Sequence, residues 1–292
     1  MHNLGLLFDV DGPIASPVTR TINVRSIVTD LVAIAAAGVP IAFITGRSGD
    51  FIRHQVVTPL CDAGLGEALD REGARMFGVF EKGGAWAPIT GEGMGEVTVD
   101  ESVAFTPEAV DGVRSLVRDR FADTMFFDET KHAMISVEQR TDVDAETYRE
   151  AQPRFQDAAF DLLTGIGVGL RYGERSAADA GGSVPFRIDP TIISTDIESV
   201  LLDKDRGARR AFDYFAARGP LPRRWRSVGD SRSDYKMADY VHDAGFEVAH
   251  VDVRPADGIL ERPYDVITIG DAIHDDAGAE FLAHWRRELG LE

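Results

Sequence analysis

The sequence predicts an α/β protein in which a doubly wound, Rossmann-like parallel sheet forms the core and an α+β cap is inserted. Three observations support this fold class. Two apolar strands flank a helical segment near the N-terminus, strands and helices alternate again in the last third, and the middle third has a different pattern. The length of 292 residues is enough for two domains, each with its own core.

The first βαβ unit lies near the N-terminus. Residues 4–8 (LGLLF) are apolar and end in an acidic loop, as expected of a strand buried on both faces of a parallel sheet. From Val24 the apolar residues recur at helical spacing until Gly38, and residues 40–44 (PIAFI) form a second buried strand. The crossover between the two strands is expected to be right-handed.

The last third of the chain repeats this alternation. It predicts a helix over 205–218, a strand over 225–228 and a helix over 235–241, followed by strands in FEVAHV and YDVITIG. Together with the first unit, these segments predict an open, doubly wound sheet.

The middle third is predicted to be the cap. It contains helical patterns near 107–121 and 144–164 and the strand-like runs TMFFD, AMISVEQ and VGLRYG. We therefore predict a catalytic core of residues 1–83 and 189–292 and an α/β cap of residues 84–188.

The charge of the chain restricts its partners. There are 49 acidic and 31 basic residues, for a net charge of −18, which disfavours nucleic acid and anionic membranes. A small anionic substrate would need local positive charge from a metal ion, backbone N–H groups or a few basic side chains. The single Cys61 excludes an internal disulfide, and we see neither signal peptide nor transmembrane helix, so we expect a cytoplasmic protein. We expect it to be a monomer or a homodimer.

Two polar motifs directly follow the first two predicted strands. Asp9 and Asp11 are followed by Gly12 at the edge where open α/β sheets bind ligands, although an acidic surface turn has the same pattern. Thr45 and Gly46 follow the second strand, where a hydroxyl and a backbone N–H can bind a phosphate oxygen. The alternative for the second motif is a plain turn before a helix.

Two further motifs lie in the last third. Lys204 begins a predicted helix and could neutralise a phosphoryl group, although most lysines are simply solvated. Asp230 and Asp234 follow another strand, and carboxylates of this kind are the protein ligands that Mg²⁺ prefers. Either aspartate alone could instead cap a helix.

The order of these four motifs resembles that of the haloacid dehalogenase superfamily of phosphatases. The resemblance covers residues 4–83 and 189–275. The insert resembles the large caps of the sugar-phosphate phosphatase branch, which includes sucrose-phosphate and mannosyl-3-phosphoglycerate phosphatases and the phosphomannomutases.

The chain departs from the usual motifs of that branch at four positions. Lys82 stands where the branch usually has Asn, and Pro13 stands where it usually has Thr. Asp205 replaces a Gly, and Ser233 replaces an Asn. These departures leave the expected chemistry intact but weaken assignment to one subfamily.

The resemblance implies a mechanism. Asp9 would be the nucleophile that forms an aspartyl-phosphate, and Asp11 would be the acid/base, shielded enough to hold a proton while Asp9 stays ionised. Mg²⁺ would be bound by Asp9, the Asp11 carbonyl and Asp230, while Asp234 would support these ligands or bind the metal through water.

Other residues would bind the substrate. The remaining phosphoryl oxygens would be bound by Thr45, Gly46 and Lys204. Groups beyond the phosphate would be read by Arg47 and by the cap residues Lys131, His132 and Arg187, although such cap residues are more often simply exposed.

The predicted function is therefore magnesium-dependent hydrolysis of a small phosphorylated metabolite, such as a sugar phosphate or a related compound. A phosphomutase that uses the same intermediate, and a non-catalytic phosphosugar-binding regulatory protein, remain as alternatives. A dehalogenase is disfavoured, because the nucleophile loop of those enzymes generally lacks the second acid.

Overall fold

The computed structural model describes residues 2–291, and the chain divides into two compact units. The core unit comprises Met1–Thr98 and Asp203–Glu292, and the cap unit comprises Val99–Leu202. Both boundaries lie later in the chain than the predicted limits of the cap, 84–188. The first differs because residues 85–90 pair with a core strand, and the second because residues 194–199 pair within the cap sheet.

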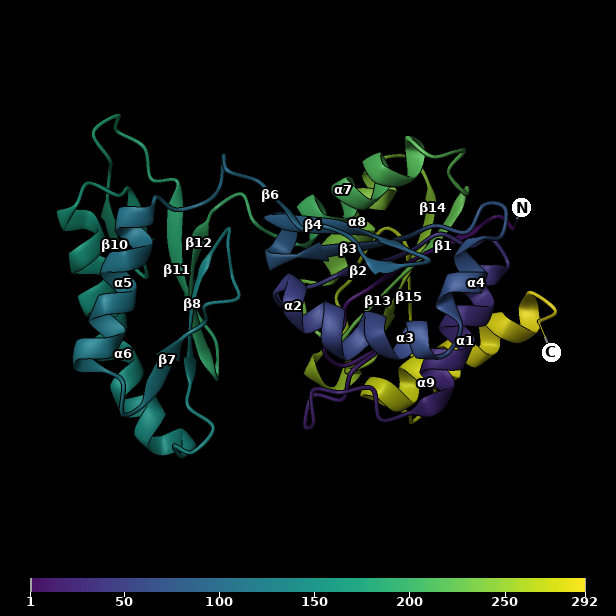
Figure 1. Cartoon of the computed structure of the whole chain (residues 1–292), viewed down its shortest axis with the longest axis horizontal. Helices are drawn as coiled ribbons and strands as arrows, with labels where there is room; N and C mark the ends of the chain where they lie inside the picture. Colours follow the sequence, from purple (N-terminus) through teal and green to yellow (C-terminus); the bar gives the residue numbers. More distant parts are fainter. Residues whose placement is uncertain (1, 292) are drawn as a thin grey trace. The chain divides into compact units, whose positions relative to one another are not determined.

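The core unit is built on a nine-stranded sheet with the order β15-β14-β13-β1-β2-β3-β4-β5, in which β6 also pairs with β4 (Figure 1). The six strands from β15 to β3 are parallel, whereas β4 and β5 continue the sheet as antiparallel strands. The strands are β1 (Leu4–Phe8), β2 (Ile41–Ile44), β3 (Met76–Phe80), β4 (Ala85–Thr90), β5 (Gly93–Met94), β6 (Thr98–Val99), β13 (Arg224–Gly229), β14 (Glu247–Asp252) and β15 (Asp265–Ile267).

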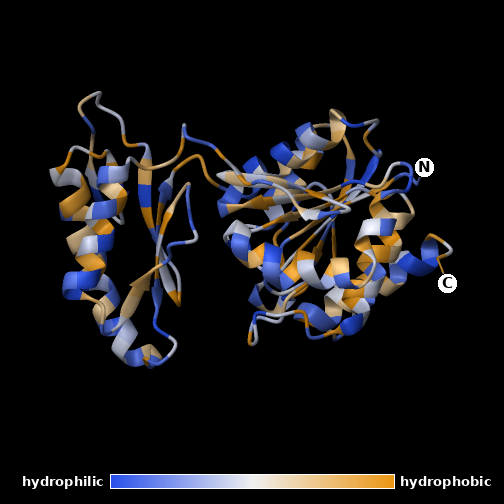
Figure 2. Cartoon of the chain, in the orientation of Figure 1, coloured by the Kyte–Doolittle hydropathy of each residue, from blue (hydrophilic) through white to orange (hydrophobic). Residues whose placement is uncertain are grey.

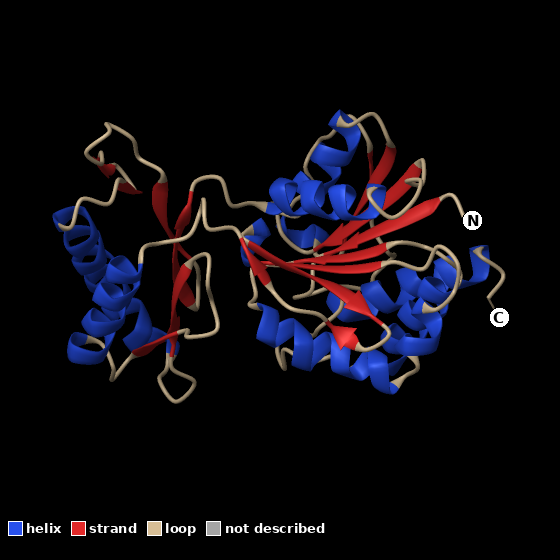
Figure 3. Cartoon of the chain, turned by 45° about the horizontal axis from the view of Figure 1, so that its top comes forward, coloured by secondary structure: helices blue, strands red, loops and turns tan. Residues whose placement is uncertain are grey.

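Helices cover both faces of the core sheet, which confirms the doubly wound prediction (Figures 1 and 3). Helices α7 and α8 lie on one face, and the other helices lie on the opposite face. The helices are α1 (Arg25–Ala36), α2 (Gly49–Ile52), α3 (Thr58–Asp62), α4 (Leu65–Leu69), α7 (Lys204–Ala216), α8 (Tyr235–Asp243) and α9 (His274–Glu288).

Apolar side chains fill both layers between the sheet and its helices. On the α7 side, Phe212 packs against the buried Trp225 with ring centroids 4.4 Å apart. On the other side, Phe8 of β1 meets Phe281 of α9 edge to face at 6.0 Å. The central strands are accordingly apolar along their length (Figure 2). This packing fixes the strand ends from which the site is built.

The cap unit has its own sheet and core. Its six strands have the order β10-β9-β11-β12-β8-β7, and α5 and α6 cover one face (Figure 1). Both helices begin at side-chain caps, Thr106 and Asp144. The elements are α5 (Pro107–Arg120), β7 (Met125–Phe127), β8 (Ile135–Gln139), α6 (Ala145–Gly165), β9 (Leu170–Tyr172), β10 (Arg175–Ala177), β11 (Phe186–Pro190) and β12 (Ser194–Ser199).

Candidate functional site

The motifs of the core unit meet at the carboxyl edge of its sheet. Strand β1 lies between β13 and β2, with Phe8 paired to Val228 on one side and to Phe43 on the other. The residues that follow these three strands are therefore neighbours. They include the predicted pairs Asp9 and Asp11, Thr45 and Gly46, and Asp230 and Asp234.

Glycines allow the close approach of these loops. Gly12 has φ +97°, and a Cβ atom at this position would lie 2.8 Å from Cγ of Asp230. Gly207 lets α7 approach β2, because a Cβ atom there would lie 2.3 Å from Cγ2 of Ile44. Both distances are too short for a side chain. Glycine at these two positions therefore allows Asp230 to lie against the loop after β1 and allows the start of α7, with Lys204, to lie against β2.

Lys204 connects three parts of the site. Its ammonium group donates to Oδ1 of Asp9 at 2.7 Å and to the carbonyl of Ile44 at 2.9 Å, and it forms an ion pair with Oδ1 of Asp234 at 2.6 Å. Oδ2 of Asp234 accepts bonds from the backbone N–H groups of Asp230 and Ser231 and from the Ser231 hydroxyl. Lys204 and the two carboxylates it contacts are all buried.

Burial and mutual charge set the proton affinities of this group. Burial raises the pKa of Asp9 well above its ordinary value, and the charge of Asp234 adds to the rise while Lys204 opposes it. Burial also acts to raise the pKa of Asp234, but the charge of Lys204 outweighs it and the pKa is lowered. Burial acts to lower the pKa of Lys204, yet the charges of Asp234 and Asp9 leave it raised.

Asp230 lies beside two basic residues that the sequence analysis did not identify. Oδ2 of Asp230 lies 3.7 Å from Nη1 of Arg254 and 3.7 Å from Nδ1 of His274. Burial, followed by the charge of Asp234, raises the pKa of Asp230 to about 6. The position of Arg254 just after the buried strand FEVAHVD was the signal that could have identified it.

The carboxylates suit a divalent cation. Oxygen atoms of Asp9, Asp230 and Asp234 all lie within 4.8 Å of one another. Burial, and then the charge of Asp234, raise the pKa values of Asp9 and Asp230 despite Lys204, so a further cation at this place would favour their ionised forms. A hard cation with oxygen ligands, such as Mg²⁺, matches both the donor type and the charge.

Asp11 is held by Arg47 rather than shielded. Nε and Nη2 of Arg47 donate to the two carboxylate oxygens of Asp11, each at 2.9 Å, and the Asp11 side chain is 30% exposed. A bidentate guanidinium contact of this kind is a strong, charge-assisted pair. The expected division of protons, with Asp9 ionised and Asp11 holding a proton, stays a prediction.

The loop that contains Thr45 and Gly46, the second predicted motif, is hydrogen-bonded to the turn that follows β3. The Thr45 hydroxyl accepts a bond from the Arg47 N–H at 3.1 Å. The turn pairs with the same loop, since Glu81 N–H donates to the Arg47 carbonyl at 3.1 Å and Lys82 N–H donates to the Thr45 carbonyl at 3.0 Å. Gly46 is thus bracketed by the turn that contains Lys82.

The three predicted cap residues belong to the other unit. Arg187 lies in β11, where it donates to Oε1 of the buried Glu198 at 2.6 Å and to the Leu202 carbonyl at 3.1 Å. Lys131 and His132 lie in the loop between β7 and β8, and His132 is exposed. Their predicted substrate contacts stay a prediction.

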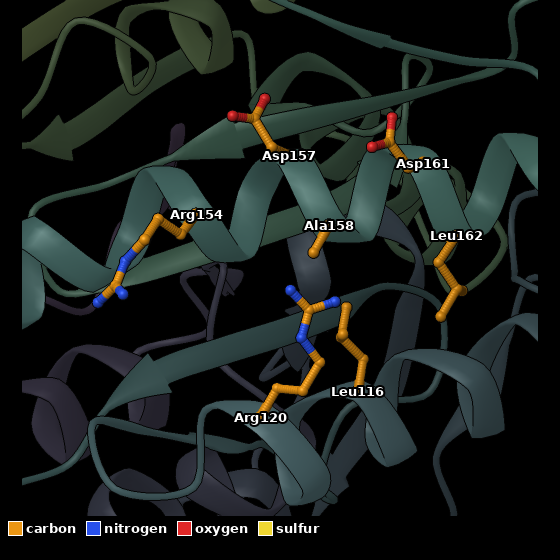
Figure 4. Close-up of a pocket in the computed structure, with 7 residues that line it drawn as sticks. All are labelled: Leu116, Arg120, Arg154, Asp157, Ala158, Asp161 and Leu162. Atoms are coloured by element: carbon orange, nitrogen blue, oxygen red, sulfur yellow. The ribbon is translucent and has the colours of Figure 1, made fainter.

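A groove of about 650 Å³ on the cap unit is lined only by residues of α5 and α6. It runs between α5 and α6, with Arg120 directed toward α6 and with Asp157 and Asp161 on the opposite side of that helix (Figure 4). Both aspartates bind Arg175. None of the predicted site residues lines the groove, so it carries no part of the proposed chemistry.

Comparison with known proteins gives likeness in structure alone. No family model matches the chain, and no curated protein matches it. Within residues 2–291, no helix is both long and apolar enough to span a bilayer.

Several solved structures match over nearly the whole chain. The C-terminal domain of a C. albicans trehalose-6-phosphate phosphatase gives a TM-score of 0.59 at 12% identity, over 99% of this chain and 93% of that one. A haloacid dehalogenase-like hydrolase from Bacteroides thetaiotaomicron gives 0.58 at 14% identity, over 96% and 98%. Plasmodium falciparum IMP-nucleotidase gives 0.52 at 10% identity, over 99% and 62%.

The parallel sheet, the acidic strand ends and the inserted unit define a two-unit α/β protein with its polar site on the core. These matches show the fold alone: the chain shares a Rossmann-like core and an inserted cap with these solved structures, one of which is a haloacid dehalogenase-like hydrolase. The fold expected from the motif order is confirmed.

Proposed function

We propose that the chain is a magnesium-dependent phosphomonoester hydrolase that forms an aspartyl-phosphate on Asp9. The observation that supports this most strongly is the bond from buried Lys204 to Asp9, at the edge where the carboxylates of Asp230 and Asp234 also gather. A carboxylate nucleophile must be ionised, and the incoming phosphoryl group is itself anionic. Positive charge beside Asp9 meets both needs.

The proposed reaction has two steps. In the first, an oxygen of Asp9 bonds to phosphorus while the bond from phosphorus to the leaving oxygen breaks, and Asp11 donates a proton to that oxygen. In the second, a water oxygen bonds to phosphorus while the bond to Asp9 breaks, and Asp11 takes a proton from the water. Free phosphate is released, and both aspartates return to their starting states.

The metal would be held by Asp9, Asp230 and the backbone carbonyl of Asp11. When bound, Mg²⁺ neutralises negative charge on the carboxylates and on the phosphoryl oxygens. Asp234 fits a supporting role, because its Oδ2 accepts three bonds from Asp230 and Ser231 and its Oδ1 faces Lys204. We propose that it orients the metal ligand and the lysine, and that any contact with the metal passes through water.

Arg47 contacts both carboxylate oxygens of Asp11, the group proposed to exchange protons with the leaving oxygen and with water. Oxygens of the substrate can compete for the guanidinium, which supports the predicted contact of Arg47 with the substrate. Thr45, Gly46 and Lys204 are proposed to bind the phosphoryl oxygens.

A sugar phosphate or a related small metabolite is the proposed substrate, in the cytoplasm. The structural likeness to a trehalose-6-phosphate phosphatase domain supports this class. We propose that Lys131, His132 and Arg187 of the cap unit select the leaving group. Replacing each by alanine should then raise KM for the best substrate without changing the metal requirement.

The test is phosphate release from a panel of phosphomonoesters, with and without Mg²⁺. We expect magnesium-dependent release by the wild-type chain and none by Asp9→Asn, which keeps the shape of the side chain but not its charge. Transfer of phosphate to a second position of a sugar, without release, would favour the phosphomutase. Binding of sugar phosphates without either reaction would favour the regulatory protein.

A further inference from the structure

The cationic side chains at the second and third predicted motifs, Arg47 and Lys204, both contact carboxylates of the site. A lysine ammonium has three N–H donors, and Lys204 faces three acceptors, which are Asp9, Asp234 and the Ile44 carbonyl. Arg47 directs Nε and Nη2 to Asp11. The site therefore holds four aspartates, Asp9, Asp11, Asp230 and Asp234, and a phosphoryl dianion placed beside them would gain from another positive charge in addition to Lys204 and Arg47.

Lys82 brings a further cationic side chain to this place. The backbone N–H groups of Glu81 and Lys82 donate to the carbonyls on either side of Gly46. Cε and Cγ of Lys82 lie 3.7 and 3.8 Å from the point that a Cβ atom of Gly46 would occupy. The aliphatic part of Lys82 therefore runs along Gly46, the residue whose backbone N–H is predicted to bind phosphate.

The turn that presents Lys82 has a strained backbone. Glu81 and Lys82 have φ values of 50° and 53°, in the left-handed region, although neither is glycine. This conformation costs about 1–2 kcal/mol for each such residue, and strain of this kind is concentrated at ligand-binding sites. The Glu81 side chain is buried, and Nε of Arg210 holds the turn by donating to the Gly83 carbonyl at 2.7 Å.

The choice of lysine at this turn is also unusual for this chain. Only four of its 31 basic residues are lysines, namely Lys82, Lys131, Lys204 and Lys236. Two of the four lie at the candidate site. A lysine ammonium is a compact point charge that can approach one phosphoryl oxygen, whereas a guanidinium is suited to bidentate contacts such as that of Arg47 with Asp11.

We propose that Lys82 is a further phosphoryl-binding residue, whose ammonium group binds a non-bridging oxygen on the Gly46 side of the site. Its ligands are phosphomonoester dianions, inorganic phosphate and pentavalent mimics such as orthovanadate. The inference rests on the proposed function for the position of the phosphoryl group. It adds a binding residue at the position where the resembling branch usually has Asn.

The test is calorimetric binding of orthovanadate and inorganic phosphate to the full chain in Mg²⁺, for the wild type, Lys82→Asn and Lys82→Arg. Asparagine tolerates the left-handed conformation, so Lys82→Asn should melt no lower than the wild type. Loss of a charged hydrogen bond should weaken binding of both anions about 10- to 100-fold. Lys82→Arg should recover most of the affinity.

The matched control is Arg71→Met, which removes one positive charge from an exposed position shortly before β3 begins, at the amino edge of the sheet. It should bind both anions like the wild type. Wild-type affinity in Lys82→Asn, or equal losses in Lys82→Asn and Arg71→Met, would overturn the inference while leaving the proposed function standing. A wild-type chain that neither binds orthovanadate nor releases phosphate would overturn both.

Discussion

Lys204→Met is expected to destabilise the core unit strongly. Lys204 is 6% exposed, and its Nζ lies 2.7 Å from Oδ1 of Asp9 and 2.6 Å from Oδ1 of Asp234. The substitution therefore leaves two buried carboxylates without their shared counter-charge. Removing one partner of a buried ion pair costs about 3–5 kcal/mol. We therefore expect the free energy of unfolding to fall by about that amount at pH 7 without Mg²⁺.

The assay is urea unfolding followed by tryptophan fluorescence. All three tryptophans, Trp86, Trp225 and Trp285, belong to the core unit, so the signal reports on the unit that contains the site. The double variant Lys204→Met/Asp234→Asn should lose less than the sum of the single variants, because it removes a carboxylate together with its cation.

The two single variants and the double variant form a double-mutant cycle, and its interaction energy measures the coupling between Lys204 and Asp234. Contacts of this kind give interaction energies of about 0.5–3 kcal/mol. A loss below about 1 kcal/mol in Lys204→Met, or additive losses in the double variant, would refute the account in which Lys204 compensates both carboxylates.

The other predictions concern the glycine, the metal ligands and a buried histidine. Gly12→Ala should lower Mg²⁺-dependent phosphate release much more than Gly64→Ala, because both have φ near +96° but only Gly12 faces Asp230; equal activities would contradict this. In calorimetric titrations with Mg²⁺, Asp230→Asn should lose more affinity than Asp234→Asn, and the reverse order would show that Asp234 is the direct ligand. Burial lowers the pKa of His250 to about 4, so its stabilising effect is present above pH 6.5 and is lost as pH falls through about 4. Between pH 7.5 and 5, the wild type should lose about 2 kcal/mol more unfolding free energy than His250→Asn, as measured by urea unfolding.

The sequence was sufficient for the parts of the fold with strong periodicity. The run LGLLF, the helix before Gly38 and the helix of residues 204–216 lie where their patterns predicted them. The carboxyl ends of β1, β2 and β13 also meet as expected, because adjacent parallel strands must end at one edge. This property of parallel sheets was enough to predict that Asp9, Thr45 and Asp230 lie close together.

The boundaries of the cap were harder to predict. Strand β4 contains Pro88 and is flanked by glycines, features that normally argue against a strand, and it is only half buried. Its pairing with β3 extends the core sheet beyond residue 83. At the other boundary, β11 continues past residue 188 and pairs with β12 as a hairpin, which no local pattern distinguished from a core strand.

Contacts between distant side chains also could not be predicted. The bonds between Arg47 and Asp11 depend on the side-chain conformation at the end of β2, and spacing in the sequence carries no information about it. His274 reaches Asp230 from the start of α9, a helix that was not predicted. The contact of His274 arises from the packing of α9 on the sheet rather than from any sequence motif.

The most direct test of the central claim is to trap the covalent intermediate. An aryl phosphate labelled at phosphorus, whose phenolate can leave without a proton from Asp11, would be mixed with Asp11→Asn in Mg²⁺, quenched in acid within one turnover and digested for peptide mapping. Because Asp11 is proposed to activate the water of the second step, this variant should accumulate label on the peptide that contains Asp9. Release of labelled phosphate without any protein-bound label, or label on a different residue, would contradict the account.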